Sequence, residues 1–226
     1  MITTRVSLLC AVLIATVAGT GLTSAKPIPP FAESLSQQED GWTAIKTDDG
    51  ILFIWNRKDL SFTLSIKGNE IRPVDAGENI FFLVDGLLLQ IQSLPISNFA
   101  SDARKNKLDD KAILMAHRDW ETKFLETELL HSKITTQSSS VKSANGTEAL
   151  LWQYDLPEGF RNPDARTQMY LSVVAKDYVI LLNSVINSTA SDTTVRSFLL
   201  DKISTLKVSQ DRIDVKKMQE AIRKGP

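Results

Sequence analysis

Two consecutive segments in the C-terminal half are apolar at nearly every position, and they limit the possible folds more than any other feature. They are 169–175 (MYLSVVA) and 178–186 (YVILLNSVI). A strand that is apolar on both sides is covered on both faces, whereas a half-exposed strand alternates apolar and polar residues. The short Lys176-Asp177 link suits a hairpin between them. The sequence therefore predicts a sheet that has packing layers on each side.

Turn signals elsewhere predict further antiparallel pairs. Asp-Gly and Asn-Gly pairs suit tight hairpins because Gly adopts positive φ freely and Asn or Asp tolerate it. A strict alternation over 60–67 (LSFTLSIK) adds a strand with one buried face. The hairpin turns are expected at Asp48-Asp49-Gly50, Asp85-Gly86 and Asn145-Gly146.

Two amphipathic helices could supply the covering layers. The first is expected over 109–131, with a buried stripe of Ile113, Ala116, Trp120 and Phe124. Lys111, Asp119, Thr122 and Glu126 fall on the opposite side of this helix.

The second helix is expected from 192 to about 206, with Ser191 or Asp192 as its N-cap. A third, weaker amphipathic stretch covers 210–224 and predicts a loosely docked tail. Strands and helices in this order predict an α+β fold with an antiparallel sheet sandwiched between helices. A cystatin-like curved sheet is the alternative. It is disfavoured by the long helix in mid-chain and by the strands that are apolar on both faces.

The N-terminus has the organisation of a secretory signal peptide. Arg5 precedes an uncharged stretch (6–22), which ends in Thr23-Ser24-Ala25 before Lys26. A basic end, an apolar run and small residues at the cut are what signal peptidase requires. We expect residues 1–25 to be removed, a proline-containing spacer over 26–40, a single domain over 41–208 and a helical tail over 209–226. An uncleaved membrane anchor is the alternative, but the strongly apolar part is short for a span.

Composition excludes several classes of function. The only cysteine, Cys10, lies in the signal segment, so we expect a mature chain without disulfides, thiol nucleophile or thiolate metal site. Without Arg5, 25 basic residues face 27 acidic ones, which gives no basic footprint for nucleic acid. No second apolar run is long enough to span a membrane. Asn145 and Asn187 begin glycosylation sequons that matter only in a eukaryotic host.

The order of elements resembles the Mog1/PsbP-like α/β/α sandwich. The resemblance covers most of 41–208 and is closest in the final stretch, AKDYVILLNSVINSTASDTTVRSFLLDKISTLKV. It is a likeness of pattern and not of a diagnostic motif. It implies a non-enzymatic fold that binds or assembles other proteins, and no functional residue is carried over from it.

Few residues point to chemistry. The two histidines, His117 and His131, are fourteen positions apart, or about 21 Å along a helix, so they cannot share a metal ion. His117 has Glu121 four residues on, and His131 has Glu128 three before it, spacings that allow a weak metal pair, a base with its orienting group, or a plain surface ion pair. The helical wheel places His117 beside Ile113 and Trp120, near the buried side.

Candidate contact residues are therefore His117, Trp120 and Glu121, together with Trp55, which we expect to be partly exposed at a strand end. Trp152 is expected in the core. The Ser/Thr-rich run 135–140 suits a solvated edge strand, which either protects the sheet edge or pairs with a partner.

Motifs for nucleophilic, zinc-protease or phosphate-loop chemistry are absent from the sequence. The acidic pairs Asp48-Asp49 and Asp109-Asp110 fit a turn and a helix start. The sequence predicts no catalytic residue, cofactor or metal. It favours an exported, non-enzymatic binding or accessory module of the bacterial envelope or secretome that acts on another envelope protein. The alternative is a small-ligand carrier or enzyme with a pocket near His117 and Trp120.

Overall fold

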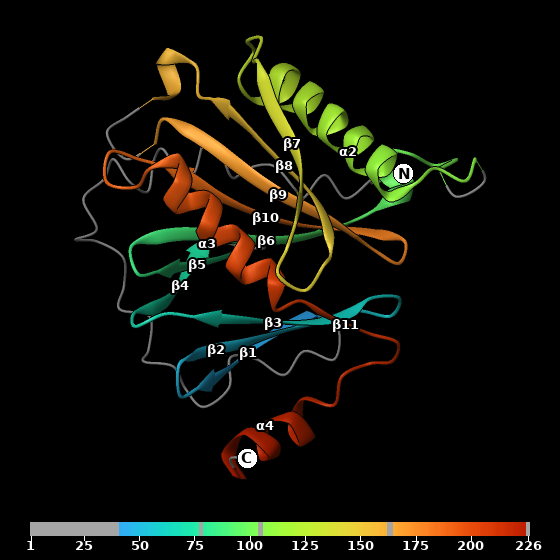
Figure 1. Ribbon diagram of the computed structural model, residues 1–226, viewed down its shortest axis with the longest axis vertical. Coiled ribbons are helices and arrows are strands. Elements are labelled where there is room, and N and C mark those ends of the chain that lie inside the picture. The colour runs from blue at the N-terminus through green and yellow to red at the C-terminus, as the bar shows by residue number, and fades with distance from the viewer. Residues whose placement is uncertain (1–40, 77–78, 104–105, 162–164, 225–226) are drawn as a thin grey trace.

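The computed structural model describes residues 41–76, 79–103, 106–161 and 165–224. The predicted signal peptide and spacer lie outside these residues. Within them the chain forms two antiparallel sheets and three α-helices, so the α+β prediction is confirmed. Figure 1 shows the two sheets as neighbouring layers, with α2 and α3 beside the larger one and α4 at the far end of the smaller one.

The smaller sheet has four strands in the order β1-β2-β3-β11. Three of them come from the start of the described chain and the fourth from near its end, so the two ends of the domain meet in this sheet. Their bounds are β1 Gly41–Thr47, β2 Gly50–Asn56, β3 Ser61–Lys67 and β11 Lys207–Ser209.

The larger sheet has seven strands in the order β4-β5-β6-β10-β9-β8-β7. Its centre is the pair of apolar strands identified in the sequence, β9 and β10, which are buried on both faces as predicted. The bounds are β4 Ile71–Ala76, β5 Asn79–Val84, β6 Leu87–Pro95, β7 Thr136–Lys142, β8 Glu148–Asp155, β9 Thr167–Ala175 and β10 Tyr178–Ile186.

The predicted hairpins all form. β1 pairs with β2, β5 with β6, β7 with β8, and β9 with β10, each antiparallel across its predicted turn. At the β5–β6 turn Asp85 and Gly86 have φ of 48° and 84°, as a type I′ turn requires. In the β9–β10 turn Lys176 has a positive φ, 55°, and so adopts the left-handed conformation that glycine supplies in other turns.

The burial of β3 differs from what the alternating sequence predicts. The prediction of one buried face is only half correct, because the polar residues Ser61 and Thr63 are buried together with Phe62 and Leu64. β3 lies between β2 and β11, and Thr205 beyond the end of α3 (Asp192–Ser204) accepts a hydrogen bond from the Ser65 amide and donates one to its carbonyl. These two hydrogen bonds give the backbone of Ser65 a partner beyond the end of α3.

One hydrophobic core joins the two sheets. It is formed by side chains from the smaller sheet, one face of the larger sheet and the inner side of α3, including Phe53, Phe62, Phe82, Leu171 and Leu199. Ser191 caps α3 by accepting a hydrogen bond from the Thr194 amide. Of the two residues that the sequence offered as the N-cap, Ser191 and Asp192, the structure uses the first. Because α3 contacts β3 as well as β9 and β10, it fixes the two sheets to each other.

The second core lies on the other face of the larger sheet, under α2 (Asp110–Phe124). Asp109 caps this helix through the Ala112 amide, and a π-helical turn, Leu125–Leu129, extends it. His131 follows with φ of 46°, close to the predicted helix end. Short 3-10 turns occur at Ile96–Asn98 and Glu158–Phe160.

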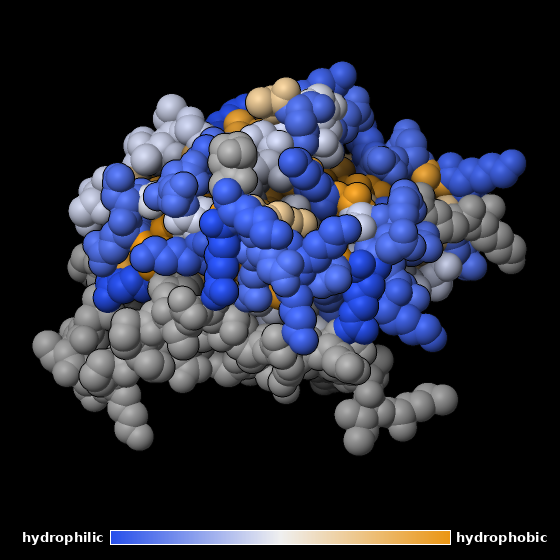
Figure 2. All heavy atoms as spheres, turned by 90° about the horizontal axis from the view of Figure 1, so that it is seen from below, coloured by the Kyte–Doolittle hydropathy of each residue, from blue (hydrophilic) through white to orange (hydrophobic). Residues whose placement is uncertain are grey.

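The predicted tail helix exists as α4, Val215–Lys224, and has no fully buried residue. It contacts β1 at the outer side of the smaller sheet (Figure 1). Figure 2, which looks onto this end, shows hydrophilic residues over most of the coloured surface and hydrophobic ones in small areas only. Among the described residues, none of the helices combines the length and hydrophobicity needed to cross a bilayer.

Candidate functional site

The buried side of α2 differs from the predicted stripe by about one residue. Trp120 and Phe124 are only partly buried, while Ile113, Leu114, His117 and Glu121 face the sheet. The sequence prediction directed the most apolar side chains of the helix inward, and therefore favoured the aromatic residues Trp120 and Phe124. The structure instead turns two polar side chains of the helix, His117 and Glu121, toward the largely aromatic and aliphatic core on this face of the sheet.

His117 and Glu121 are therefore the central residues under α2. Their side chains are 0% and 2% exposed, far more buried than the core-edge position that the wheel predicted for His117. Within the described part of the chain, neither imidazole nitrogen of His117 has a hydrogen-bond partner, nor has Oε2 of Glu121. A buried polar atom without a partner costs roughly 1–3 kcal/mol, so this pair is a costly feature of the core.

Burial moves the pKa values of both residues toward their neutral forms. It lowers the pKa of His117 from 6.5 to about 4 and raises that of Glu121 from 4.5 to about 8. At neutral pH the helix thus presents an uncharged imidazole and an uncharged carboxylic acid. Each can donate one hydrogen bond and accept another, and together they are not an ion pair.

Aromatic side chains form the floor below this pair. Trp152 on β8 stacks on Tyr170 of β9, with ring centroids 4.0 Å apart and planes within 4°. Tyr154 is 1% exposed, and its pKa is raised by burial and, further, by the nearby Glu121. The prediction that Trp152 belongs to the core is confirmed.

Polar residues continue this floor across the sheet. Tyr170 pairs with Asn183 on β10, which pairs with Gln90 on β6, so these side chains share one face. Asn183 donates to Gln90 and accepts from Gln168 at 2.9 Å. The chain of buried amides is satisfied, unlike His117 and Glu121. Sequence reasoning missed it because its members are distant in sequence and sit within apolar strands.

Two further aromatic side chains, Phe99 and Trp120, lie beside His117. Phe99 meets the His117 ring edge-on at 5.2 Å between centroids, and Trp120 lies 6.2 Å from Phe99 and 6.4 Å from His117. Three of the four candidate residues named from the sequence, His117, Trp120 and Glu121, thus lie together on α2.

Trp55 is separate from that group, and the prediction that it is partly exposed is wrong. It is 6% exposed, lies in the core between the sheets and stacks on Phe62 at 6.0 Å. The Arg57 guanidinium lies 4.6 Å from the centre of its ring. This cation covers the strand end that the sequence suggested was open to solvent.

His131 is exposed and does not meet His117. The described residues contain no group of three or more His, Cys, Asp or Glu side chains placed to hold a metal ion. Asp109 serves as the cap of α2, and Asp49 forms an exposed ion pair with Lys67 in the β1–β2 region. These acids have structural roles.

The edge strand β7 is the second candidate site. The sequence predicted a solvated edge strand here, and the structure places β7 at one end of the larger sheet with Gln137–Ser140 all exposed. Ser138 and Ser140 pair with Trp152 and Leu150 and so lie on the α2 side. Arg118 of α2 reaches the edge and donates to the Ser138 hydroxyl at 2.9 Å.

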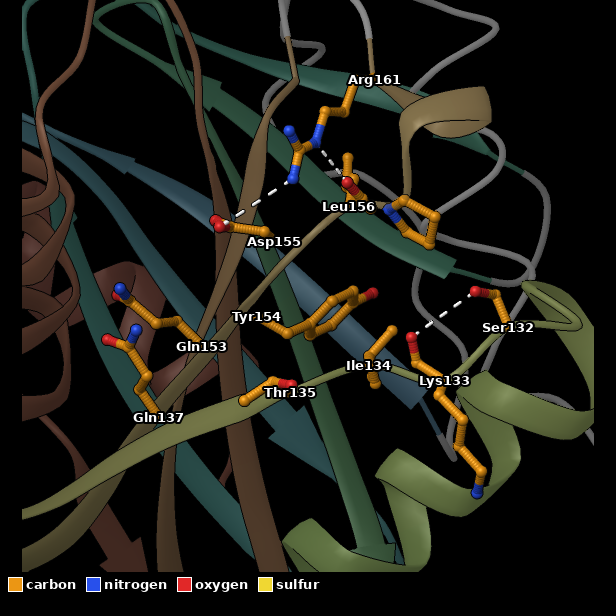
Figure 3. Close-up of a pocket in the computed structure, with 11 residues that line it drawn as sticks. Ser132, Lys133, Ile134, Thr135, Gln137, Gln153, Tyr154, Asp155, Leu156 and Arg161 are labelled. Atoms are coloured by element: carbon orange, nitrogen blue, oxygen red, sulfur yellow. Dashed lines mark hydrogen bonds and ion pairs between the residues drawn. The ribbon is translucent and has the colours of Figure 1, made fainter.

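Two hollows border this edge. One, of about 360 Å³, lies where the segment before β7 diverges from the end of β8. Figure 3 shows Tyr154 directed toward Ile134 in this hollow. Arg161 forms an ion pair with Asp155 and donates a hydrogen bond to the Leu156 carbonyl. The other, of about 290 Å³, is called the α2–β7 hollow below. It is lined by Lys111, Leu114, Ser140, Val141, Lys142, Glu148, Ala149 and Leu150. Neither hollow includes His117, Trp120 or Glu121.

Comparisons with known proteins do not assign this chain to a family. No family model matches it, and the search of curated proteins found no match. Among solved structures, a protein from Bacteroides thetaiotaomicron is similar with a TM-score of 0.32 and 10% identity, over 66% of this chain and 46% of that chain. This chain thus spans less than half the length of that neighbour, and a likeness at this level carries no functional argument.

Proposed function

We propose that this chain is an exported, non-enzymatic binding or accessory module, periplasmic or secreted, which attaches an extended segment of another envelope protein to β7. The observation that carries the proposal is the unprotected edge of the larger sheet. The signal-like N-terminus supports export. The Mog1/PsbP-like resemblance, with its implied role in protein assembly, is part of the same proposal.

The other described sheet edges carry the usual devices against strand addition. β4 contains Pro73 beside the charged Arg72, β11 has only three residues, and α4 packs against β1. β7 has seven residues, no proline and no glycine, and its only charged residue is the terminal Lys142. A long, unprotected edge presents unpaired backbone groups that can pair with an incoming strand.

Site-specific crosslinking tests this function. A photoreactive amino acid at Ser139, in the exported chain in a host with a periplasm, should give a discrete adduct with one envelope protein. The same group at exposed Lys58, in the loop after β2, should not. Identical adducts from both positions, or none from Ser139, would contradict attachment at β7.

A proline pair supplies the edge-blocked control. Amides of an edge strand alternate between pairing with the neighbouring strand and pointing outward, so one of Ser139→Pro and Ser140→Pro removes only an outward N–H. The variant that keeps the wild-type melting temperature is the edge-blocked form. Introduced beside a photoreactive group at Gln137, it should abolish the adduct that this position gives in the wild-type chain.

A second candidate function is favoured by the pair under α2. The partnerless atoms of His117 and Glu121 would gain hydrogen bonds if α2 lifted and admitted a small polar molecule above the Trp152 and Tyr154 rings. This version corresponds to a small-ligand carrier or enzyme near His117 and Trp120. It requires movement of α2, because both polar side chains are fully covered.

A further inference from the structure

We infer that the α2–β7 hollow selects the segment that pairs with β7, and that it favours an apolar side chain next to an acidic one. This inference rests on the proposed attachment at β7 and specifies the chemistry of the partner. Strand addition supplies affinity through the main chain, whereas pockets beside the added strand distinguish its side chains. The hollow lies at the correct position for such a pocket.

The position follows from the pleat of the sheet. Ser140 pairs with Leu150, which is buried in the core under α2, so Ser140 points to the α2 side. A guest strand would lie about 4.8 Å beyond β7, and its residue opposite Ser140 would point to the same side. Ser140 also lines the hollow. The guest side chain at this point is therefore directed along the hollow and toward α2.

The inner surface of the hollow is apolar. Leu114 of α2 and Leu150 of β8 are each 3% exposed and form its base. Serines on β7 are short, so they leave space above this buried base. An apolar guest side chain in this space would itself be removed from water, which is favourable in proportion to the area buried.

The charge at the mouth of the hollow is positive. Lys142 and Glu148 approach each other at 3.6 Å and largely cancel, with both side chains well exposed. Lys111 is exposed and has no ion pair among the described residues. Arg118, further along the same edge, is already paired with Asp119. Lys111 is thus the cation left to attract a carboxylate on the guest strand.

Same-face neighbours on a strand are two residues apart, about 6.6 Å. A carboxylate two positions from the apolar guest residue therefore lies on the α2 side, within the range of a flexible lysine side chain. The preferred segment is extended, with one apolar residue opposite Ser140 and one acidic residue two positions away. The alternative of a basic segment would place like charges together at Lys111.

Synthetic peptides test this preference directly. The probes are fluorescent nine-residue peptides of alternating Thr and Ser with a central Leu, and with Asp, Asn or Lys two positions away. Wild-type protein should bind the Asp peptide roughly five-fold more tightly than the Lys peptide, because an exposed ion pair contributes up to about that factor. Lys111→Glu should reverse the order. Lys123→Glu, the same charge change at an exposed position on α2, should leave it unchanged.

Two further measurements make the outcome decisive. The edge-blocked proline variant should bind none of the peptides, and replacing the central Leu by Ser should weaken binding to wild type. An unchanged order in Lys111→Glu, or no loss with Ser, would overturn the selection at the hollow while leaving attachment at β7 intact. Absence of peptide binding to wild type, together with an adduct from Ser139, would also overturn it. Equal binding to the edge-blocked variant would contradict β7 itself.

Discussion

At the scale of single residues, His117 and Glu121 are the pair that distinguishes this core. On the inner side of α2, both imidazole nitrogens of His117 and Oε2 of Glu121 have no hydrogen-bond partner among the described residues, and each residue is neutral at pH 7 because burial disfavours the charged form. Tyr154 faces them from the sheet, and burial raises the pKa of its hydroxyl, so it stays neutral in the acidic and neutral range. The two residues therefore affect stability in opposite directions as pH changes.

The pH dependence of stability follows from these pKa values. His117, with its pKa lowered from 6.5 to about 4, makes unfolding easier as pH falls below 6.5. Glu121, with its pKa raised from 4.5 to about 8, makes unfolding easier as pH rises above 4.5. Between 4.5 and 6.5 the two effects cancel. From pH 6.5 to 8 only Glu121 contributes, and the free energy of unfolding should fall by about 2 kcal/mol.

Denaturant titrations of wild type and Glu121→Gln across pH 4 to 8.5 check this prediction. The glutamine variant cannot ionise, so its stability should be level above pH 6.5. It should decrease as pH falls from 6.5 toward 4, because the contribution of His117 is then uncompensated. Asp49 and Glu126 have lowered pKa values and add a common decrease at acidic pH in both proteins. Parallel curves for the two proteins would contradict the pKa assignment of Glu121.

Among the described secondary-structure elements, β7 and β1 are both edge strands, but only β1 has a helix packed against its edge. β7 is left open, while the edge at β1 has α4 packed beside it. The segment before α4 is held by Asn56 at the end of β2. The side-chain amide of Asn56 donates a hydrogen bond to the Ile213 carbonyl at 2.8 Å and accepts one from the Ile213 N–H at 3.0 Å.

Asn56→Ala should therefore release α4 without unfolding the domain. It removes both hydrogen bonds to Ile213, and α4 has no fully buried residue that would hold it otherwise. Proteolysis within 210–224 should become faster, whereas the melting temperature of the sheets should change by only a few degrees. Asn145→Ala, which alters the remote β7–β8 turn, is the matched control and should not expose α4. Equal protection of α4 in both variants would show that other contacts secure it.

At the scale of the whole molecule, two cores on opposite faces of the seven-stranded sheet hold the fold together. The smaller sheet and α3 cover one face, and α2 covers the other. No cysteine occurs between residues 41 and 226, so the described domain depends on this packing and not on disulfides. This arrangement is compatible with the export that we propose.

Export gives a prediction for the complete chain. The form recovered outside the cytoplasm should begin at Lys26, because Thr23-Ser24-Ala25 offer the small side chains that signal peptidase accepts. N-terminal sequencing and intact mass measurement check the cut. Ala25→Leu should slow processing, since a large side chain no longer fits at the cleavage site. Recovery of the exported form with Met1 retained would contradict cleavage.

The local sequence determined most of the secondary structure. Positive-φ turns at Asp85-Gly86 and Asn145-Gly146, the doubly apolar β9 and β10, and the cap residues of α2 and α3 are properties of neighbouring residues, so they could be predicted. The solvated edge at β7 was predictable for the same reason, because consecutive Ser and Thr residues offer little to bury.

Only the tertiary structure decided what lies beside each element. The chain divides into two sheets because β3 does not pair with β4, which follows it, and β3 pairs instead with β11 from a distant part of the chain. The inward position of His117 and Glu121 depends on how α2 packs on β8 and β9, and the burial of Trp55 depends on Phe62 and Arg57. Periodicity shows which residues share a face, but the direction of that face is set by long-range packing, because burial is a property of the partner surface as well as of the element itself.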